Sequence, residues 1–249
     1  NHIKPEQVVS KSVVSTYIFD YTGVYHMPLS VNIKNGINTI GFYISEQDIL
    51  LERIILVPVG NSIDYEDYRN KYSDKKVYDG INILIEGEEA TLKSASVLSP
   101  VSDKSDPLVS PVKAGTILLN AIGGNAWKIP NQYIKWSVSV EEEGLYAISF
   151  KARQNRVQGQ KSHRTLYING EIPFSEVADI EIDYSSKWQL ITLGGEKPYL
   201  FYLKKGENEI TLSSTLGKID KTIRLVDNAV NELNVIYRKL LMVLGSEPD

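Results

Sequence analysis

Apolar and polar residues alternate over short runs between residues 81 and 213, and this period of two constrains the fold more than any other feature of the chain. The run Tyr133–Val140 is the clearest case, because its even-numbered residues are all apolar and its odd-numbered residues are tyrosine, lysine and serine. Successive side chains of a strand point to opposite faces, so this run predicts a strand with one buried face, as in antiparallel sheets. Further strands are predicted at residues 145–152, 164–168, 188–193, 199–203 and 209–213.

Glycine-containing turns separate these runs. Gly144 follows three glutamates, Asn169 and Gly170 follow the run 164–168, and Gly206 follows two lysines. Glycine and asparagine supply the positive φ that tight hairpin turns require. Many short strands joined by such turns predict an all-β fold, an antiparallel jelly-roll β-sandwich over residues 81–216.

An internal repeat indicates a second, incomplete unit. Residues 33–40 and 203–210 share the pattern apolar-Lys-x-Gly-x-Asn-x-Ile, and each copy follows an aromatic-rich run. The first copy lacks the preceding strands, so we expect residues 1–60 to form a partial β-sandwich, the C-terminal half of a first jelly roll. Residues 61–80 are polar and rich in tyrosine, which predicts a linker with a short helix capped by Ser62 or Asp64.

Residues 217–245 break the alternation and predict a long C-terminal amphipathic α-helix that ends at Gly245. A long apolar stripe on this helix needs a cover, which the sandwich, another domain or a second chain can supply. The apolar positions recur at helical spacing: Ile219, Ile223, Val226, Val230, Leu233, Ile236, Tyr237, Leu240 and Leu241.

Composition excludes several classes of protein. The net charge is −4 and no dense block of Lys and Arg occurs, so nucleic acid is not an expected partner. No apolar run approaches the ~20 residues that span a bilayer, so direct membrane insertion is not expected either. The chain has no cysteine, and its first residues carry neither Met nor a signal-peptide core, which indicates a piece cut from a longer chain.

Two groups of side chains have the chemistry of a carbohydrate site, where aromatic rings contact sugar faces while amides and charges bind hydroxyls. One lies in the loop 125–133 and the other where strands end near residues 153–164. The alternatives are that Trp127 packs its own loop and that the polar residues pin a long loop to the sandwich. The predicted ligand-binding residues are Trp127, Asn125, Tyr133, Arg153, Gln154, Asn155 and Arg164.

Glu86 and Glu88 are the candidate metal ligands. On a strand they would point to one face, which suits Ca²⁺ when a third carboxylate and carbonyl oxygens converge. The alternative is a solvated edge strand whose charges prevent aggregation. The three histidines are far apart in the sequence, and no recognised motif of a catalytic or metal site occurs.

The stretch that begins at Ile83 resembles the family 35 and family 6 carbohydrate-binding sandwiches. The likeness rests on the runs Ile85–Ala90, Tyr133–Trp136, Gly144–Phe150 and Leu203–Ile210. Residues 80–249 more closely resemble the sandwich region of large extracellular solute-binding lipoproteins that accompany sugar ABC transporters in Gram-positive bacteria. That second likeness rests on the runs Trp136–Glu141, Lys151–Asn155, Arg164–Phe174 and Asn231–Arg238.

The resemblance implies a bacterial, extracellular role in handling polysaccharide at the cell surface, with membrane anchoring through a parent protein. It also implies that Glu86 and Glu88 lie on the strand that helps to hold calcium in the binding modules. Those families close with a strand that carries an acidic ligand, whereas this chain has the predicted helix at that place.

The expected function is therefore non-catalytic binding of an oligo- or polysaccharide by part of a larger surface protein linked to sugar uptake. One alternative is a structural spacer that contacts other domains of the parent chain and binds no ligand. Another is an accessory part of a polysaccharide-active enzyme. Carboxylates alone do not identify a glycosidase, because that chemistry depends on how far apart two of them lie across a cleft.

Overall fold

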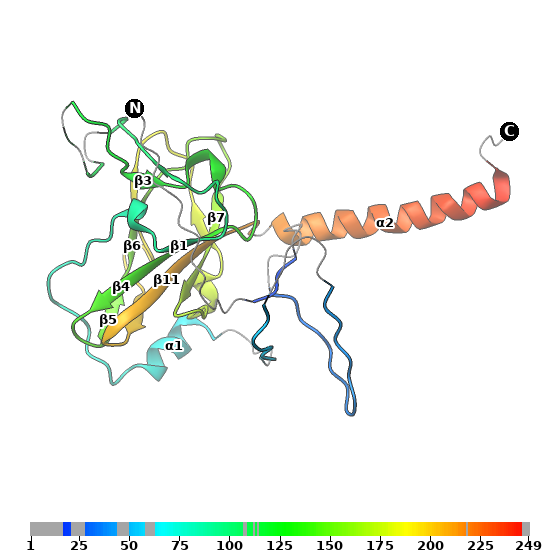
Figure 1. Ribbon diagram of the computed structural model, residues 1–249, viewed down its shortest axis with the longest axis horizontal. Coiled ribbons are helices and arrows are strands. Elements are labelled where there is room, and N and C mark those ends of the chain that lie inside the picture. The colour runs from blue at the N-terminus through cyan, green and yellow to red at the C-terminus, as the bar shows by residue number, and fades with distance from the viewer. Residues whose placement is uncertain are drawn as a thin grey trace.

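The computed structural model describes residues 17–20, 28–43, 50–57, 63–106, 109–111, 113, 115–217 and 219–245. Strands dominate between residues 92 and 215, and a helix lies on either side of them in the sequence (Figure 1). The elements are α1 (Tyr65–Lys71), β1 (Leu92–Lys93), β2 (Pro100–Val101), β3 (Ala121–Ile122), β4 (Tyr133–Val140), β5 (Gly144–Ala147), β6 (Ser149–Ala152), β7 (Ser162–Ile168), β8 (Ile180–Ile182), β9 (Gln189–Thr192), β10 (Leu200–Leu203), β11 (Gly206–Thr215) and α2 (Ile219–Leu244), with 3₁₀ turns at Gly87–Glu89, Gly124–Ala126 and Ser175–Val177.

The first layer is a five-stranded antiparallel sheet in the order β1-β4-β11-β7-β8. The alternation that the sequence predicts for β4 decides which side of this strand faces inward. Ile134, Val138 and Val140 are buried, whereas Ser137 and Ser139 are exposed. Burial of one side of each strand supplies the driving force for the layer to pack on a second one.

The second layer consists of β5 and β6, which are interrupted only at Ile148, and of their partners β10 and β9. The amide of Leu193 donates to the carbonyl of Ile148 at 3.1 Å, which joins the two strand pairs. The predicted fold class, an antiparallel β-sandwich followed by a long helix, is confirmed. The two layers share one core, which includes Val138, Val140, Leu166, Ile168, Ile210 and Leu212 from the first and Tyr146, Leu193, Phe201 and Leu203 from the second.

Helix α1 covers the outer edge of β10. The amides of Leu200 and Tyr202, which point away from β5, donate to the hydroxyls of Tyr65 and Tyr68, both at 3.0 Å. Asp64 caps the helix by accepting a hydrogen bond from the amide three residues later, at 2.8 Å. Burial raises the pKa of Tyr68 to about 12, and this side chain belongs to the core. The segment predicted as a linker thus blocks a strand edge that could otherwise pair with another chain.

The internal repeat forms the same turn twice. The amide of Lys204 donates to Asn208 Oδ1 at 3.1 Å, and Asn208 Nδ2 donates to the carbonyls of Lys204 and Gly206 at 2.7 Å and 3.1 Å. Asn38 makes the same three bonds with the residues four and two before it, at 3.1, 2.7 and 3.0 Å. No strand is present within residues 28–43 and 50–57 as described. The partial sandwich at residues 1–60 therefore stays a prediction.

Helix α2 projects away from the sandwich (Figure 1). Its stripe is largely exposed, as Val226 at 58%, Leu233 at 64% and Leu240 at 51% show. Neither of the helices in the described part of the chain is long and apolar enough to cross a membrane. Apolar residues recur along α2 at alternating intervals of four and three residues, at Ile219, Ile223, Val226, Val230, Leu233, Tyr237, Leu240 and Leu244.

The two copies of the turn provide a matched pair of variants. Asn208 is 1% exposed and its side chain bonds the backbone of Lys204 and Gly206, whereas Asn38 is exposed. We expect Asn208→Ala to lower the free energy of unfolding by about 2 kcal/mol, because the turn loses the hydrogen bonds of a buried side chain, and Asn38→Ala to lower it by less than about 0.5 kcal/mol. Urea denaturation measures both. Equal effects would contradict the structural importance of the buried copy.

Candidate functional site

An ion pair between Arg153 and Asp103 organises one surface of the sandwich. Arg153 directly follows β6, and Asp103 lies two residues after β2. The guanidinium donates to the Asp103 carboxylate and to the Ser105 hydroxyl, and it lies 5.1 Å from the centroid of the Trp188 ring. The side chains of Arg153 and Asp103 are only 17% and 11% exposed, so their positions are fixed from several sides.

The surroundings of Asp103 favour its charged form. Burial raises the pKa of this carboxyl, but hydrogen bonds from Ser105 and the charge of Arg153 outweigh burial, and the pKa lies below its usual value. Asp103 is therefore a fixed hydrogen-bond acceptor near neutral pH and not a proton donor.

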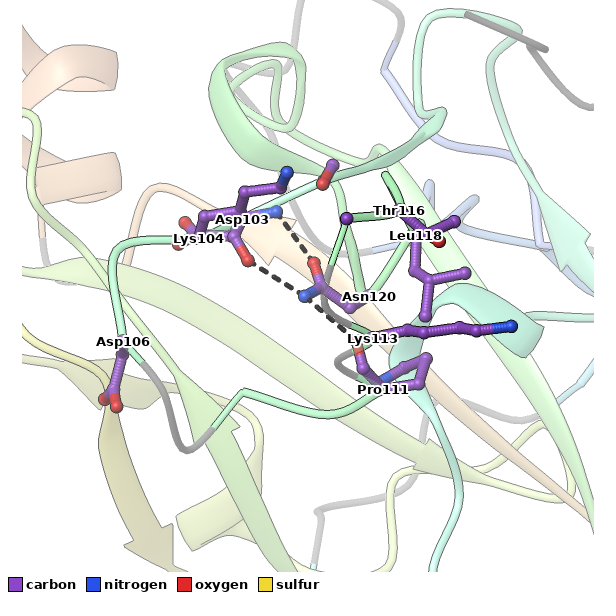
Figure 2. Close-up of a pocket in the computed structure, with 10 residues that line it drawn as sticks. Asp103, Lys104, Asp106, Pro111, Lys113, Thr116, Leu118 and Asn120 are labelled. Carbon is purple, nitrogen blue, oxygen red and sulfur yellow. Dashed lines mark hydrogen bonds between the residues drawn. The ribbon is translucent and has the colours of Figure 1, made fainter.

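Asp103 also lines a pocket of about 250 Å³ in the segment between β2 and β3, shown in Figure 2. Asn120 holds this pocket together. Its Oδ1 accepts from the amide of Asp103 at 2.7 Å, and its Nδ2 donates to the carbonyls of Asp103 and Pro111 at 2.9 Å and 3.4 Å. The lining combines charges, hydroxyls and an amide with two apolar side chains. It consists of Ser102, Asp103, Lys104, Asp106, Pro111, Lys113, Gly115, Thr116, Leu118 and Asn120.

Gln154 and Asn155 continue the chain from Arg153. Gln154 pins its own loop, because its Nε2 donates to the carbonyls of Val157 and Gln160 at 3.2 Å and 2.8 Å and its Oε1 accepts from the amide of Arg156. Asn155 is exposed. Of these two predicted residues, Gln154 is engaged within the protein and Asn155 faces solvent.

Trp127 and Arg164 contact each other. The Arg164 guanidinium lies 4.3 Å from the centroid of the Trp127 ring and also donates to the Trp127 carbonyl at 3.2 Å. Trp127 Nε1 donates to the carbonyl of Gln132 at 2.9 Å, and Gly123 packs so closely that a Cβ there would lie 2.8 Å from the ring. Burial lowers the pKa of Arg164 to about 10. The donor of this indole and much of its ring are thus engaged within the protein.

The predicted ligand-binding residues therefore divide into two groups. Asn125, exposed in the turn Gly124–Ala126, and Tyr133, half-buried at the start of β4, belong with the Trp127 loop. Arg153 belongs instead with Asp103 beside the pocket, whereas Asn155 is exposed two residues further along the chain. Sequence reasoning missed Asp103 and Asn120, which lie in a segment without periodicity. The available signal was Asp103 two residues before Ser105, a spacing at which an aspartate accepts from a nearby amide, as it does here at 2.7 Å.

The predicted conformation at Glu86 and Glu88 is wrong. Gly87–Glu89 form a 3₁₀ turn and not a strand, so the two side chains do not share a strand face. The turn is fixed by Trp136, whose Nε1 donates to the carbonyl of Gly87 at 2.9 Å. The residues predicted as a strand therefore form a turn that Trp136 holds.

The two carboxyl groups still influence each other. Burial is the main cause that raises the pKa of Glu88, and the charges of Glu86 and Glu89 raise it further. Glu88 Oε2 is buried and has no hydrogen-bond partner among the described residues, a gap that a cation would fill. Glu86 Oε1 accepts from the Ser110 hydroxyl at 3.0 Å. No third acidic group completes this pair in the part of the chain that the structure describes.

No family model and no curated protein matches the chain. Among solved structures, a family 35 carbohydrate-binding module from Clostridium thermocellum is similar at 19% identity, over 42% of this chain and 72% of that chain, with a TM-score of 0.32. A ruminal GH26 endo-β-1,4-mannanase is 20% identical over 55% of this chain and 24% of the enzyme, with a TM-score of 0.34. A GH26-CBM35 β-(1,4)-mannanase from Podospora anserina is 14% identical over 53% and 24%, with a TM-score of 0.36.

The chain spans about a quarter of the length of the two mannanases. All three structural likenesses are partial, as their TM-scores show. What the chain binds is therefore argued below from its own residues.

The Asp103–Arg153 pair predicts a pH dependence of stability. Because the folded-state pKa of Asp103 is lowered, the pair stabilises the protein above the usual pKa of 3.8, and this contribution is lost as the pH falls through the lowered value. We expect Asp103→Asn to lower the free energy of unfolding by about 2 kcal/mol at neutral pH and to flatten its decline in acid. Urea denaturation across the pH range measures this.

The matched control is Glu209→Gln, which removes a carboxylate from an ion pair with Lys135 that is more open to solvent. Exposed pairs contribute about 0 to 1 kcal/mol, so this variant should keep the acid decline of the wild type. An unchanged acid decline in Asp103→Asn would refute the assignment.

Proposed function

We propose that this chain is a non-catalytic carbohydrate-binding region of a larger extracellular protein, and that it binds an oligo- or polysaccharide at the pocket between β2 and β3. The observation that carries the proposal is the anchoring of this pocket. Its loop is held by Asn120 from within and by the Asp103–Arg153 pair from the adjoining layer. Residues held in this way, Asp103 and Asn120 above all, lose little conformational freedom when a ligand binds.

The pocket has suitable chemistry for a sugar. Lys113 offers a donor, the Thr116 hydroxyl offers a donor and an acceptor, and Pro111 and Leu118 offer apolar contact for a sugar face. Asn155, exposed two residues after Arg153, stays a proposed ligand-binding residue. Because few rings are buried and each hydroxyl contact exchanges one made with water, affinity should be modest, with Kd on the order of 0.1 to 1 mM.

The state of Asp103 does not suit the general acid of glycoside hydrolysis. A general acid in that reaction needs a raised pKa, whereas the pKa of Asp103 is lowered and its carboxylate is committed to Arg153. The proposal places the chain outside the cell, at the surface of a protein linked to sugar uptake. The support for that location is the resemblance of its sequence runs to those of the solute-binding lipoproteins.

Variants in the two groups of candidate residues locate the ligand. We expect Lys113→Met and Thr116→Val each to weaken glycan binding about fivefold, since each removes one hydrogen-bonding group from the pocket lining. Asn125→Ala, an exposed amide beside Trp127, is the matched control and should bind as the wild type does. Isothermal titration against a panel of soluble oligo- and polysaccharides measures the affinities.

The same variants, together with an assay for reducing sugar, distinguish this proposal from a site at the Trp127 loop and from an enzyme. Loss of binding in Asn125→Ala or Trp127→Ala, with Lys113→Met unaffected, would move the ligand to the Trp127 loop. Release of reducing sugar by the wild type would identify an accessory part of an enzyme and overturn the non-catalytic proposal.

A second candidate function, a spacer that contacts other domains of a parent chain, is favoured by the exposed stripe of α2. Ile33 and Ile40 are also 47% and 42% exposed, although their counterparts in the second repeat, Leu203 and Ile210, are 3% and 7% exposed. A pure spacer would give no saturable signal with any glycan. It would instead associate with neighbouring segments of the parent protein.

We also propose that Glu86 and Glu88 bind Ca²⁺, with the remaining ligands supplied by carbonyl oxygens and water. The support is the buried, unpartnered Glu88 Oε2 beside a second carboxylate. Calcium would supply charge compensation that stabilises the turn Gly87–Glu89, and it would take no part in chemistry. The ion is expected to stabilise the fold through its binding to the folded state alone.

Calcium addition tests this proposal. We expect millimolar CaCl₂ to raise the Tm of the wild type by a few degrees, and Glu86→Gln or Glu88→Gln to abolish the rise, because each removes a ligand charge. Glu89→Gln, an exposed neighbour in the same turn, is the matched control and should keep the response. Differential scanning calorimetry measures Tm. A wild type that does not respond to calcium would refute the site.

A further inference from the structure

Three potential metal ligands meet on the edge of the first layer, close to the start of α2. β7 and β8 are antiparallel neighbours with His163 opposite Glu181, and Asp179 directly precedes β8. One imidazole nitrogen of His163 and one carboxylate oxygen from each acidic residue lie within 4.8 Å of one another. Ligand atoms around a tetrahedral ion at about 2.1 Å are roughly 3.4 Å apart, so small side-chain movements bring all three to one ion.

The imidazole of His163 is held in place on two sides. Its Nδ1 lies 2.6 Å from Asp179 Oδ1. Gly217, at a φ of +59°, packs against the ring so closely that a Cβ there would lie 2.2 Å from Nδ1. The side chains of His163, Asp179 and Glu181 are 13%, 28% and 27% exposed. The cluster is thus largely preorganised and can still be reached by an ion from solvent.

We propose that His163, Asp179 and Glu181 bind a divalent transition-metal ion, with Zn²⁺ as the reference ion and water completing its coordination. An imidazole beside two carboxylates suits Zn²⁺, whereas Ca²⁺ and Mg²⁺ prefer sites made of oxygen ligands alone. This site is separate from the glutamates at residues 86 and 88. Since Gly217 lies two residues before α2, the ion fixes the sheet edge beside the root of the helix.

Lys161 competes with a metal ion for the carboxylate of Glu181. Its Nζ lies 2.6 Å from Glu181 Oε2 and 3.4 Å from Asp183 Oδ1. The ammonium group balances part of the negative charge without an ion and opposes the approach of a second cation. Removal of this charge by Lys161→Met should therefore tighten zinc binding. A cluster that serves only as a set of ion pairs would gain no metal affinity from that change.

Titration of the metal-free chain with ZnCl₂ tests the proposal. We expect one saturable zinc site by isothermal titration, weakened about tenfold or more in His163→Gln and in Glu181→Gln, and tightened in Lys161→Met. Co²⁺ provides a second readout, because its visible absorption bands report nitrogen and oxygen ligands directly. CaCl₂ should not displace the zinc.

The matched control is Glu209→Gln. Like Glu181, Glu209 is a strand carboxylate paired with a lysine, but no histidine or second acidic group of the described residues completes a metal cluster around it. Asp179→Asn keeps a hydrogen-bonding group beside His163 while it removes a charged ligand, and it serves if His163→Gln lowers stability. No saturable zinc binding by the wild type, or equal zinc affinity in Glu209→Gln and in the variants of the site, would overturn the proposal.

Discussion

The ring of Phe174 joins the parts of the sandwich on which the rest of the structure depends. It is fully buried, and its centroid lies 4.9 Å and 5.1 Å from the rings of Tyr65 and Tyr68 in α1 and 5.2 Å and 5.3 Å from those of Tyr199 and Phe201. Aromatic pairs at such distances add stabilisation beyond the area that they bury. This cluster places the two α1 hydroxyls where the edge amides of β10 need acceptors. The two layers therefore keep a fixed position relative to each other, and so do the ends of the strands from which the loops begin.

The sequence predicts the sandwich well where a single physical rule operates. In β4 the alternation is enough, because burial of one face decides the side-chain directions. The prediction from sequence fails at Glu86 and Glu88, where the conformation depends on a hydrogen bond from Trp136, a residue far away in the sequence. The role of α1 also cannot be predicted from the sequence, because a tyrosine hydroxyl that accepts a hydrogen bond from the amide of an edge strand leaves no periodic pattern.

The candidate site was predictable only in part. Arg153 was identified because it lies at the end of a strand, but its partner Asp103 lies in an irregular segment whose path no local pattern reveals. Trp127 illustrates the opposite difficulty. A loop tryptophan is equally suited to bind a sugar or to pack its own loop, and only the position of Arg164 shows how much of its ring the protein uses. The cluster at His163 depends on strand register, which brings together residues that are unremarkable in the sequence.

The paired turns at Asn38 and Asn208 bear on how the chain folds. The first turn closes with the same bonds although the residues around it are exposed, so closure requires no surrounding core. Each closure joins residues only four positions apart, which carries a small loss of chain entropy. Hairpins of this kind form in about 1 to 10 μs. The connection between β10 and β11 can therefore form in the collapsing chain before strands distant in the sequence pair, and it links a strand of the second layer to one of the first from the start.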